Sequence, residues 1–168
     1  MALISSFTLI RVVSVFHIFL AFVLLQNPQK VADHDLVFFL GEATHMPHAT
    51  SAFSKPSHAS AFLAVILAFL GVVDLSAVSM PTVLAMQYWA VQVPVRLAFL
   101  FGLTALTYMM KPLGDSKTRA FGQDLKNSVV FTWAFTELLL WYWIYSANRE
   151  ERKMLVVQRG SDGETAAT

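Results

Sequence analysis

Four ionisable side chains stand inside otherwise apolar stretches of the chain: Arg11, Asp74, Arg96 and Glu137. A charge at the centre of a membrane-spanning helix costs roughly 2.5 to 3.5 kcal/mol, so such side chains face protein or water and seek partners. Two are acids and two are bases, so two neutral ion pairs can form. A carboxyl group can act as a general acid or base only if it is left unpaired.

Four apolar segments carry these residues, and each approaches the ~20 residues that a helix needs to cross a bilayer. They are residues 4–25, 59–78, 94–110 and 128–145. The chain is 56% hydrophobic and only 14% charged, with a mean hydropathy of +0.56, which is more apolar than an ordinary soluble domain. We therefore expect an all-α polytopic membrane protein: a four-transmembrane-helix bundle over residues 1–153, followed by a flexible polar tail over residues 154–168.

The depth of each charge predicts how the four pair. Asp74 lies near the end of the second segment and Arg96 near the start of the third, so both lie close to the same membrane surface. At ~1.5 Å per residue, Arg11 lies ~10 Å and Glu137 ~12 Å below that same surface. The sequence predicts a shallow pair of Asp74 with Arg96 and a deeper pair of Arg11 with Glu137.

Small residues at helical spacing predict where helices pack closely, because they let two backbones approach. They are Ala61, Ala64, Ala68 and Gly71 in the second segment and Ala98 and Gly102 in the third. Asp74 extends the first set by three residues, so it is expected to face a neighbouring helix. The second set lies nearly opposite Arg96, which predicts that the third helix has neighbours on two sides.

Aromatic residues and one proline predict the ends of the segments. Trp89, Trp141 and Trp143 are expected to anchor the helices at the membrane interface. Pro94 either begins the third helix or kinks a longer helix that starts near Thr82. We favour the first interpretation, because a straight helix from Thr82 to Met110 would be ~43 Å long and the hydrocarbon layer is ~30 Å thick.

Several kinds of chemistry find no support in the sequence. The chain has no cysteine, and hence no disulfide or thiolate metal site. Four histidines between residues 34 and 58 are interpreted as part of a solvated loop, so we assign no metal, cofactor or catalytic residue. The 12 basic residues are dispersed and balanced by 11 acidic ones, so we expect no nucleic-acid partner.

The four charges leave three interpretations open. They can form ion pairs that fix the order of the helices, which we call folding staples. They can instead line a polar cavity that binds a lipid headgroup, ion or sterol, or one of them can be a catalytic acid or base. We favour the staples, because an unpaired charge in hydrocarbon is costly.

Short motifs around these charges resemble the fungal "increased loss of mitochondrial DNA protein 1" family. They are Arg11, Gly71-Val72-Val73-Asp74-Leu75, Val93-Pro94-Val95-Arg96-Leu97, Glu137 and Ala147-Asn148-Arg149-Glu150-Glu151. The resemblance runs from about Ser6 to Lys153. It implies a multi-pass protein of the endoplasmic reticulum membrane that is linked, indirectly, to maintenance of the mitochondrial genome and has no assigned enzymatic reaction.

The functional expectation is a non-enzymatic accessory or scaffold protein that affects lipid supply or organelle contact. Its expected partners are the lipid bilayer and other membrane proteins of the endoplasmic reticulum, with a bound lipid or sterol as a further candidate. The alternative is a lipid- or sterol-binding four-helix membrane protein, including an isomerase. An isomerase needs a carboxylate that is free to act on a ligand in a cavity.

Overall fold

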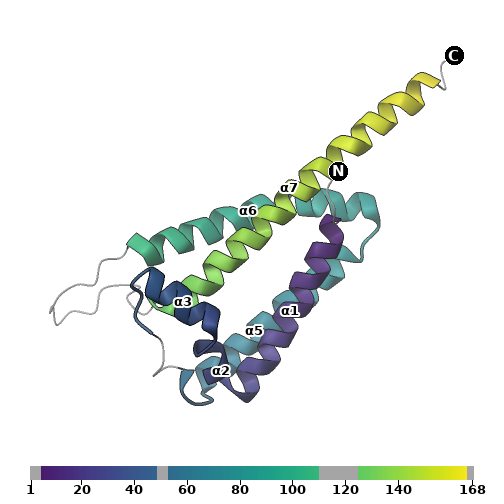
Figure 1. Cartoon of the computed structure of the whole chain (residues 1–168). Coiled ribbons are helices and arrows are strands. Elements are labelled where there is room, and N and C mark those ends of the chain that lie inside the picture. Colours follow the sequence, from purple (N-terminus) through teal and green to yellow (C-terminus); the bar gives the residue numbers. More distant parts are fainter. Residues whose placement is uncertain (1–4, 49–52, 110–124, 166–168) are drawn as a thin grey trace.

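The computed structural model describes residues 5–48, 53–109 and 125–165, and in this part of the chain all regular structure is helical (Figure 1). The helices are α1 (Ser6–Gln26), α2 (Pro28–Ala32), α3 (Asp35–Ala43), α5 (His58–Val78), α6 (Thr82–Met109) and α7 (Ser128–Thr165). The predicted all-α class agrees with these elements.

Local sequence explains where the long helices begin and end. Pro28, at the first position of α2, cannot continue the hydrogen bonding of α1, which ends at Gln26. Ser57 caps α5 reciprocally: its hydroxyl accepts the N–H of Ser60, and the Ser60 hydroxyl accepts the N–H of Ser57. Pro81 stands immediately before α6 and separates it from α5.

Among the described residues, three helices are long and apolar enough to cross a membrane: α1, α5 and α6. The fourth predicted span, residues 128–145 at the start of α7, is not among them. Glu137 and the polar atoms of Trp133, Trp141 and Tyr142 make this segment less apolar than the other three. The described part of the chain is therefore all-helical, with three helices that fit a membrane protein, while the fourth crossing stays a prediction.

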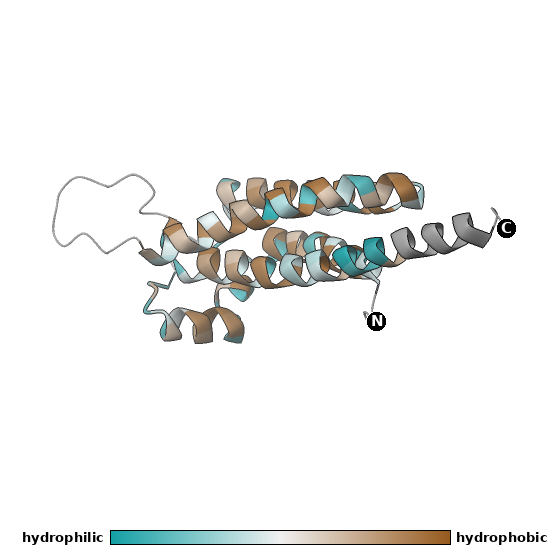
Figure 2. Cartoon of the chain, turned by 90° about the horizontal axis from the view of Figure 1, so that it is seen from above, coloured by the Kyte–Doolittle hydropathy of each residue, from teal (hydrophilic) through white to brown (hydrophobic). Residues whose placement is uncertain are grey.

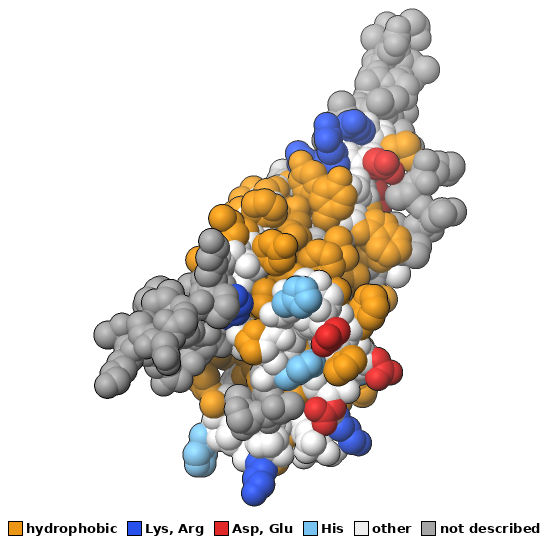
Figure 3. Space-filling model, turned by 60° about the vertical axis from the view of Figure 1, so that its left-hand side comes forward, with side chains coloured by type: hydrophobic (Ala, Val, Ile, Leu, Met, Phe, Trp, Pro, Cys, Tyr) orange, Lys and Arg blue, Asp and Glu red, His pale blue; other side chains and the backbone are white. Residues whose placement is uncertain are grey.

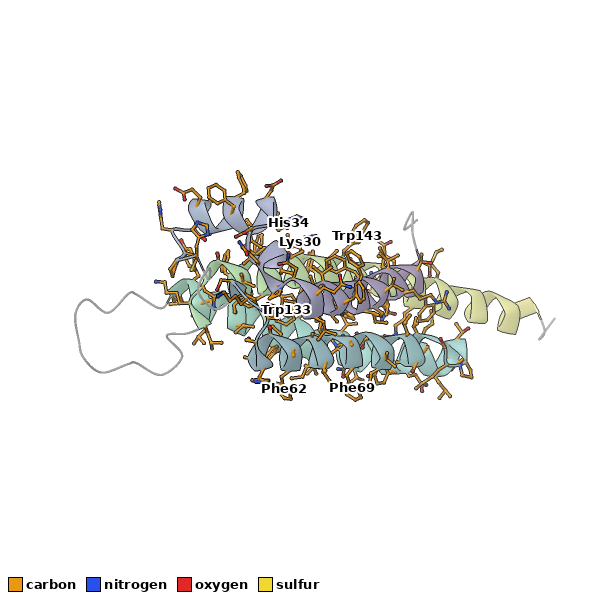
Figure 4. All side chains as sticks on the ribbon, turned by 90° about the horizontal axis from the view of Figure 1, so that it is seen from below. Lys30, His34, Phe62, Phe69, Trp133 and Trp143 are labelled. Carbon is orange, nitrogen blue, oxygen red and sulfur yellow. The ribbon has the colours of Figure 1, made fainter. Side chains whose placement is uncertain are left out.

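Large apolar side chains cover the outside of these helices. Phe62, Phe69, Phe99 and Phe101 are each 65–67% exposed, and Phe62 and Phe69 project outward from α5 (Figure 4). Hydrophobic residues run along the long helices (Figure 2) and form a broad band between charged groups at the two ends of the surface (Figure 3). A soluble monomer rarely exposes so large an apolar surface, whereas a lipid-facing belt requires one.

The long helices form two pairs, in which α1 packs along α5 and α6 packs along α7 (Figure 1). The short helix α3 packs against α7. One buried cluster joins both pairs, with Ile10 and Val13 from α1, Val78 from α5, Trp89 from α6 and Trp141 from α7 among its members. A second cluster, of Ala21, Leu24, Ala64 and Leu67, joins only α1 and α5. The two pairs are therefore held together mainly near the N-terminal end of α1.

The predicted small-residue face of α5 contacts α1. Ala64 is fully buried, Gly71 is buried, and Ala61 and Ala68 are half-buried. A Cβ atom at Gly71 would lie 2.7 Å from the carbonyl oxygen of Ser14 and 2.8 Å from Cγ1 of Ile18. The two backbones approach so closely at this point that only glycine fits.

The second predicted packing face is wrong for this structure. Ala98 and Gly102 are exposed, and a Cβ atom at Gly102 would meet nothing within 4 Å. The physical reason is that α6 contacts α7 through the side that carries Trp89, Val93 and Leu100, which leaves the small residues on its outer surface.

Two predicted helix boundaries are also corrected. Pro94 lies inside the continuous helix α6, so the third helix begins at Thr82 and not at residue 94. Helix α7 continues to Thr165, so residues 154–165 of the predicted flexible tail are helical. Met154, Leu155, Gln158 and Arg159 are good helix formers, whereas Val156, Val157, Gly160 and Gly163 are poor ones, so propensity alone does not explain this extension.

Replacing Gly71 with alanine is expected to destabilise the protein by about 1 to 3 kcal/mol, because the added methyl group meets the rigid backbone oxygen of Ser14. The matched control is Gly102→Ala, for which we expect a gain of about 0.5 to 1 kcal/mol, since alanine is the better helix former and the space is open. Reversible unfolding in detergent micelles measures both. Equal effects at the two positions would contradict the close approach of α1 and α5.

Candidate functional site

The first buried charge pair joins α5 to α6. Asp74 is 0% exposed, and Arg96 donates to both of its carboxylate oxygens, with Nη1 2.6 Å from Oδ2 and Nη2 2.5 Å from Oδ1. This two-point geometry is the strongest arrangement of an arginine with a carboxylate. The structure thus brings together the two residues that the sequence paired at the shallower level.

Glu137 has a different partner from the predicted one. It is 3% exposed, and its Oε1 lies 2.7 Å from Nε2 of His17 in a hydrogen bond between α7 and α1. Its other oxygen, Oε2, accepts the indole N–H of Trp141 at 2.8 Å. Both carboxylate oxygens of Glu137 are therefore engaged by protein groups.

The predicted pair of Arg11 with Glu137 is wrong. Arg11 is exposed, while α1 buries Ile10, Ser14 and His17, which recur at spacings of four and three. Arg11 does not lie on this buried face. Although its depth is similar to that of Glu137, its side chain lies on the exposed side of α1 and does not pair with Glu137. An arginine at this depth can extend its long side chain toward the interface and keep its charge in water.

Two stacked tryptophans connect the charge pair to the Glu137 site. The rings of Trp89 and Trp141 stack with centroids 5.7 Å apart and an interplanar angle of 27°. The guanidinium of Arg96 lies 4.5 Å from the Trp141 ring and 5.6 Å from the Trp89 ring, in cation–π contact. Trp141 therefore touches both Arg96 and Glu137.

Three tryptophans, Trp89, Trp141 and Trp143, are predicted to be interface anchors, and the structure differs for the first two. Trp89 and Trp141 are fully buried, because each packs against the other and under Arg96. Trp143 is half exposed on the outer side of α7, where an interface anchor can lie.

Together these contacts make one polar network that connects all four long helices. It runs from His17 in α1 through Glu137 and Trp141 in α7 to Arg96 in α6 and Asp74 in α5. A further contact joins α1 to α7, where Glu151 accepts hydrogen bonds from the backbone N–H and the hydroxyl of Ser6 at 2.8 and 2.5 Å. The network and this contact link the two helix pairs.

The chemistry available to this network is limited by its own contacts. An imidazole and a carboxyl group can exchange a proton; here each oxygen of Glu137 already has one hydrogen-bond partner in the protein, and both oxygens of Asp74 accept from Arg96. Within the described ranges, no three histidine, aspartate or glutamate side chains gather to hold a metal ion. Nδ1 of His17 is buried and has no hydrogen-bond partner among the described groups. Asp74 and Glu137 thus each make a contact between two helices, while one ring nitrogen of His17 has no partner among the described groups.

Comparison with known protein families matches residues 4–158 to the family described as "increased loss of mitochondrial DNA protein 1". The chain belongs to this family. No curated protein and no solved structure matches the chain. The match includes every residue of the polar network, and with three apolar helices it identifies a membrane protein linked to mitochondrial DNA maintenance.

Two residues of the network in this member of the increased loss of mitochondrial DNA protein 1 family were not predicted for their roles. His17 is not among the residues to which the sequence analysis gives a role, and Trp141 is predicted to lie at the interface. The sequence does contain one signal for Trp141, because a residue four positions after Glu137 lies on the same face of a helix. His17 shows a similar signal, since it extends the spacing of Ile10 and Ser14.

Replacing Trp141 with phenylalanine in this family member removes the N–H that Glu137 Oε2 accepts but keeps an aromatic ring against Arg96. We expect a loss of about 1 to 3 kcal/mol, the range for a buried acceptor that loses its hydrogen-bond partner. Trp143→Phe is the matched control on the exposed side of α7 and is expected to change stability little. Thermal unfolding followed by circular dichroism compares the two, and equal midpoints would argue against the Glu137 contact.

Proposed function

We propose that this protein is a non-enzymatic accessory or scaffold protein of the endoplasmic reticulum membrane, which supports the mitochondrial genome indirectly through lipid supply or organelle contact. The observation that carries the proposal is that Asp74 and Glu137 both have their two carboxylate oxygens engaged by other helices or side chains. The ionisable groups are used to assemble the helices, and the broad apolar outer surface is left for lipid and for other membrane proteins.

The proposal includes a fourth membrane crossing by residues 128–145. This part of α7 packs along α6, which is itself apolar enough to span a membrane. Its charged residue, Glu137, is buried and hydrogen-bonded, so it would not face lipid. Four crossings place both ends of the chain on the same side.

The contacts favour this proposal over an isomerase. A cavity of about 700 Å³ lies between α6 and α7, and neither Asp74 nor Glu137 is among the residues that line it. An acid–base mechanism needs a carboxylate within hydrogen-bond reach of the ligand. A ligand in this cavity would therefore be bound by other groups.

Purification of the tagged full chain in a mild detergent from cross-linked membranes tests the scaffold role. We expect one endoplasmic reticulum membrane protein to co-purify at constant stoichiometry, and deletion of that protein to cause the same loss of mitochondrial DNA as deletion of this chain. A monomer without a reproducible partner would contradict the proposal, as would a partner whose deletion leaves mitochondrial DNA intact.

A further inference from the structure

A cationic cavity lies where α6 and α7 pack against each other, next to the polar network, because its lining residue Trp89 stacks on Trp141 and contacts Arg96. It is a groove open on one side, with a volume of about 700 Å³, and its lining residues Arg149, Arg152 and Lys153 are exposed. Helix α6 contributes Trp89, Ala90 and Pro94, and α7 contributes Tyr145, Asn148, Arg149, Arg152 and Lys153. One wall is thus aromatic and apolar, and the other is polar and basic.

The charge of this cavity is of one sign. Three of its lining residues are cations, Arg149, Arg152 and Lys153, and none is acidic. Spacings of three and four residues place these cations on one face of α7. Of the two nearby acids, Glu151 is held by Ser6, and Glu150 does not line the cavity. The lining therefore attracts an anion.

Two buried polar groups in the lining have no partner among the described groups. Asn148 is 4% exposed and its Oδ1 has no hydrogen bond, and Trp89 is 0% exposed and its Nε1 has none. Pro94 also has no N–H to offer the carbonyl oxygen of Ala90, one turn earlier in α6. Buried polar groups are nearly always satisfied, so a donor and an acceptor in residues that line the cavity still lack a partner.

The position of the cavity indicates what kind of anion fits. Beyond Tyr145, α7 changes from apolar to charged, as expected where a helix leaves the hydrocarbon layer. Val91 and Val95, beside the cavity residues on α6, are 70% and 59% exposed and offer an apolar surface to an acyl chain. A basic site close to such a surface matches a molecule with an anionic head and a hydrocarbon tail.

We propose that this cavity binds the headgroup of an acidic phospholipid. The phosphate lies among Arg149, Arg152 and Lys153, and a donor group of the head, such as an ammonium, reaches Oδ1 of Asn148. This lipid site is independent of the proposed scaffold role. The protein could bind the lipid without any protein partner, and it could act as a scaffold without bound lipid.

Native mass spectrometry of the full chain from nanodiscs with equal parts of phosphatidylserine and phosphatidylcholine tests the site. We expect the wild-type protein to retain phosphatidylserine preferentially. Each cation near a membrane surface contributes about fivefold to such binding, so Arg149→Gln with Arg152→Gln should lower the preference by about tenfold or more. The matched control removes two cations from the opposite end, Lys30→Gln with Lys55→Gln, and should keep the preference.

A second variant separates a built site from general attraction to basic residues. Asn148→Leu keeps all three cations, and it is expected to lower phosphatidylserine retention several-fold while the helical content stays that of the wild type. Excess inorganic phosphate should not displace the lipid. No preference in the wild-type protein, equal loss in the Lys30 and Lys55 control, an unaffected Asn148 variant, or displacement by inorganic phosphate would each overturn the proposal.

Discussion

Replacing Arg96 with methionine is expected to lower the free energy of unfolding by about 3 to 5 kcal/mol, the usual effect of breaking a buried ion pair. Asp74 is 0% exposed and has both oxygens on Arg96, so the variant leaves a carboxylate in the interior without a partner. The stacking of the guanidinium on Trp141 is lost as well. Unfolding of the purified protein in mixed micelles, followed by circular dichroism, measures the effect.

The control for this prediction removes both charges. Asp74→Leu combined with Arg96→Met leaves no unpaired charge, so the double variant should be more stable than either single variant. A purely additive double variant would show that Asp74 and Arg96 do not interact. A wild-type stability for Arg96→Met alone would contradict the buried pair altogether.

Replacing His17 with leucine is expected to cost about 3 kcal/mol, because Glu137 keeps only the N–H of Trp141 as a partner. The hydrogen bond between His17 and Glu137 is also one of the few polar links from α1 to α7, so its loss should loosen the contact between the two helix pairs. Hydrogen exchange of the α1 amides, measured beside the unfolding free energy, reports this loosening.

Arg11→Leu is the matched control on the same helix. Arg11 is exposed, so its removal should change stability by less than about 0.5 kcal/mol. The opposite ranking, with Arg11→Leu more harmful than His17→Leu, would favour the Arg11 partner that depth alone predicted for Glu137.

The approximate positions of the apolar segments and the Asp74–Arg96 contact could be predicted, because they depend on composition and on depth along neighbouring helices, whereas the start of α6 and the end of α7 could not. The three apolar helices follow from hydropathy, and Asp74 and Arg96 stand on consecutive helices joined by a short turn, so similar depth suffices to bring them together. The sequence thus contained most of the information for these features.

The partner of Glu137 could not be predicted, because depth does not specify the direction in which a helix turns its side chains. Depth alone allows either Arg11 or His17 to pair with Glu137. Only His17 is on the buried face of α1. Trp89 and Trp141 were misassigned for a similar reason. An indole with an apolar body and a polar N–H suits both an interface and a buried network, and the contacts with Arg96 and Glu137 decide between them.

Glu137→Gln tests most directly the claim that the buried carboxylate joins helices and does not catalyse a reaction. The glutamine oxygen can still accept the Trp141 N–H and its amide can still hydrogen-bond His17, but the group can no longer act as an acid or base. The measurement is mitochondrial DNA copy number in cells that carry the variant as their only copy, with the membrane abundance of the protein measured in parallel. The structure predicts wild-type copy number; a normally abundant variant that loses mitochondrial DNA as the deletion does would contradict it.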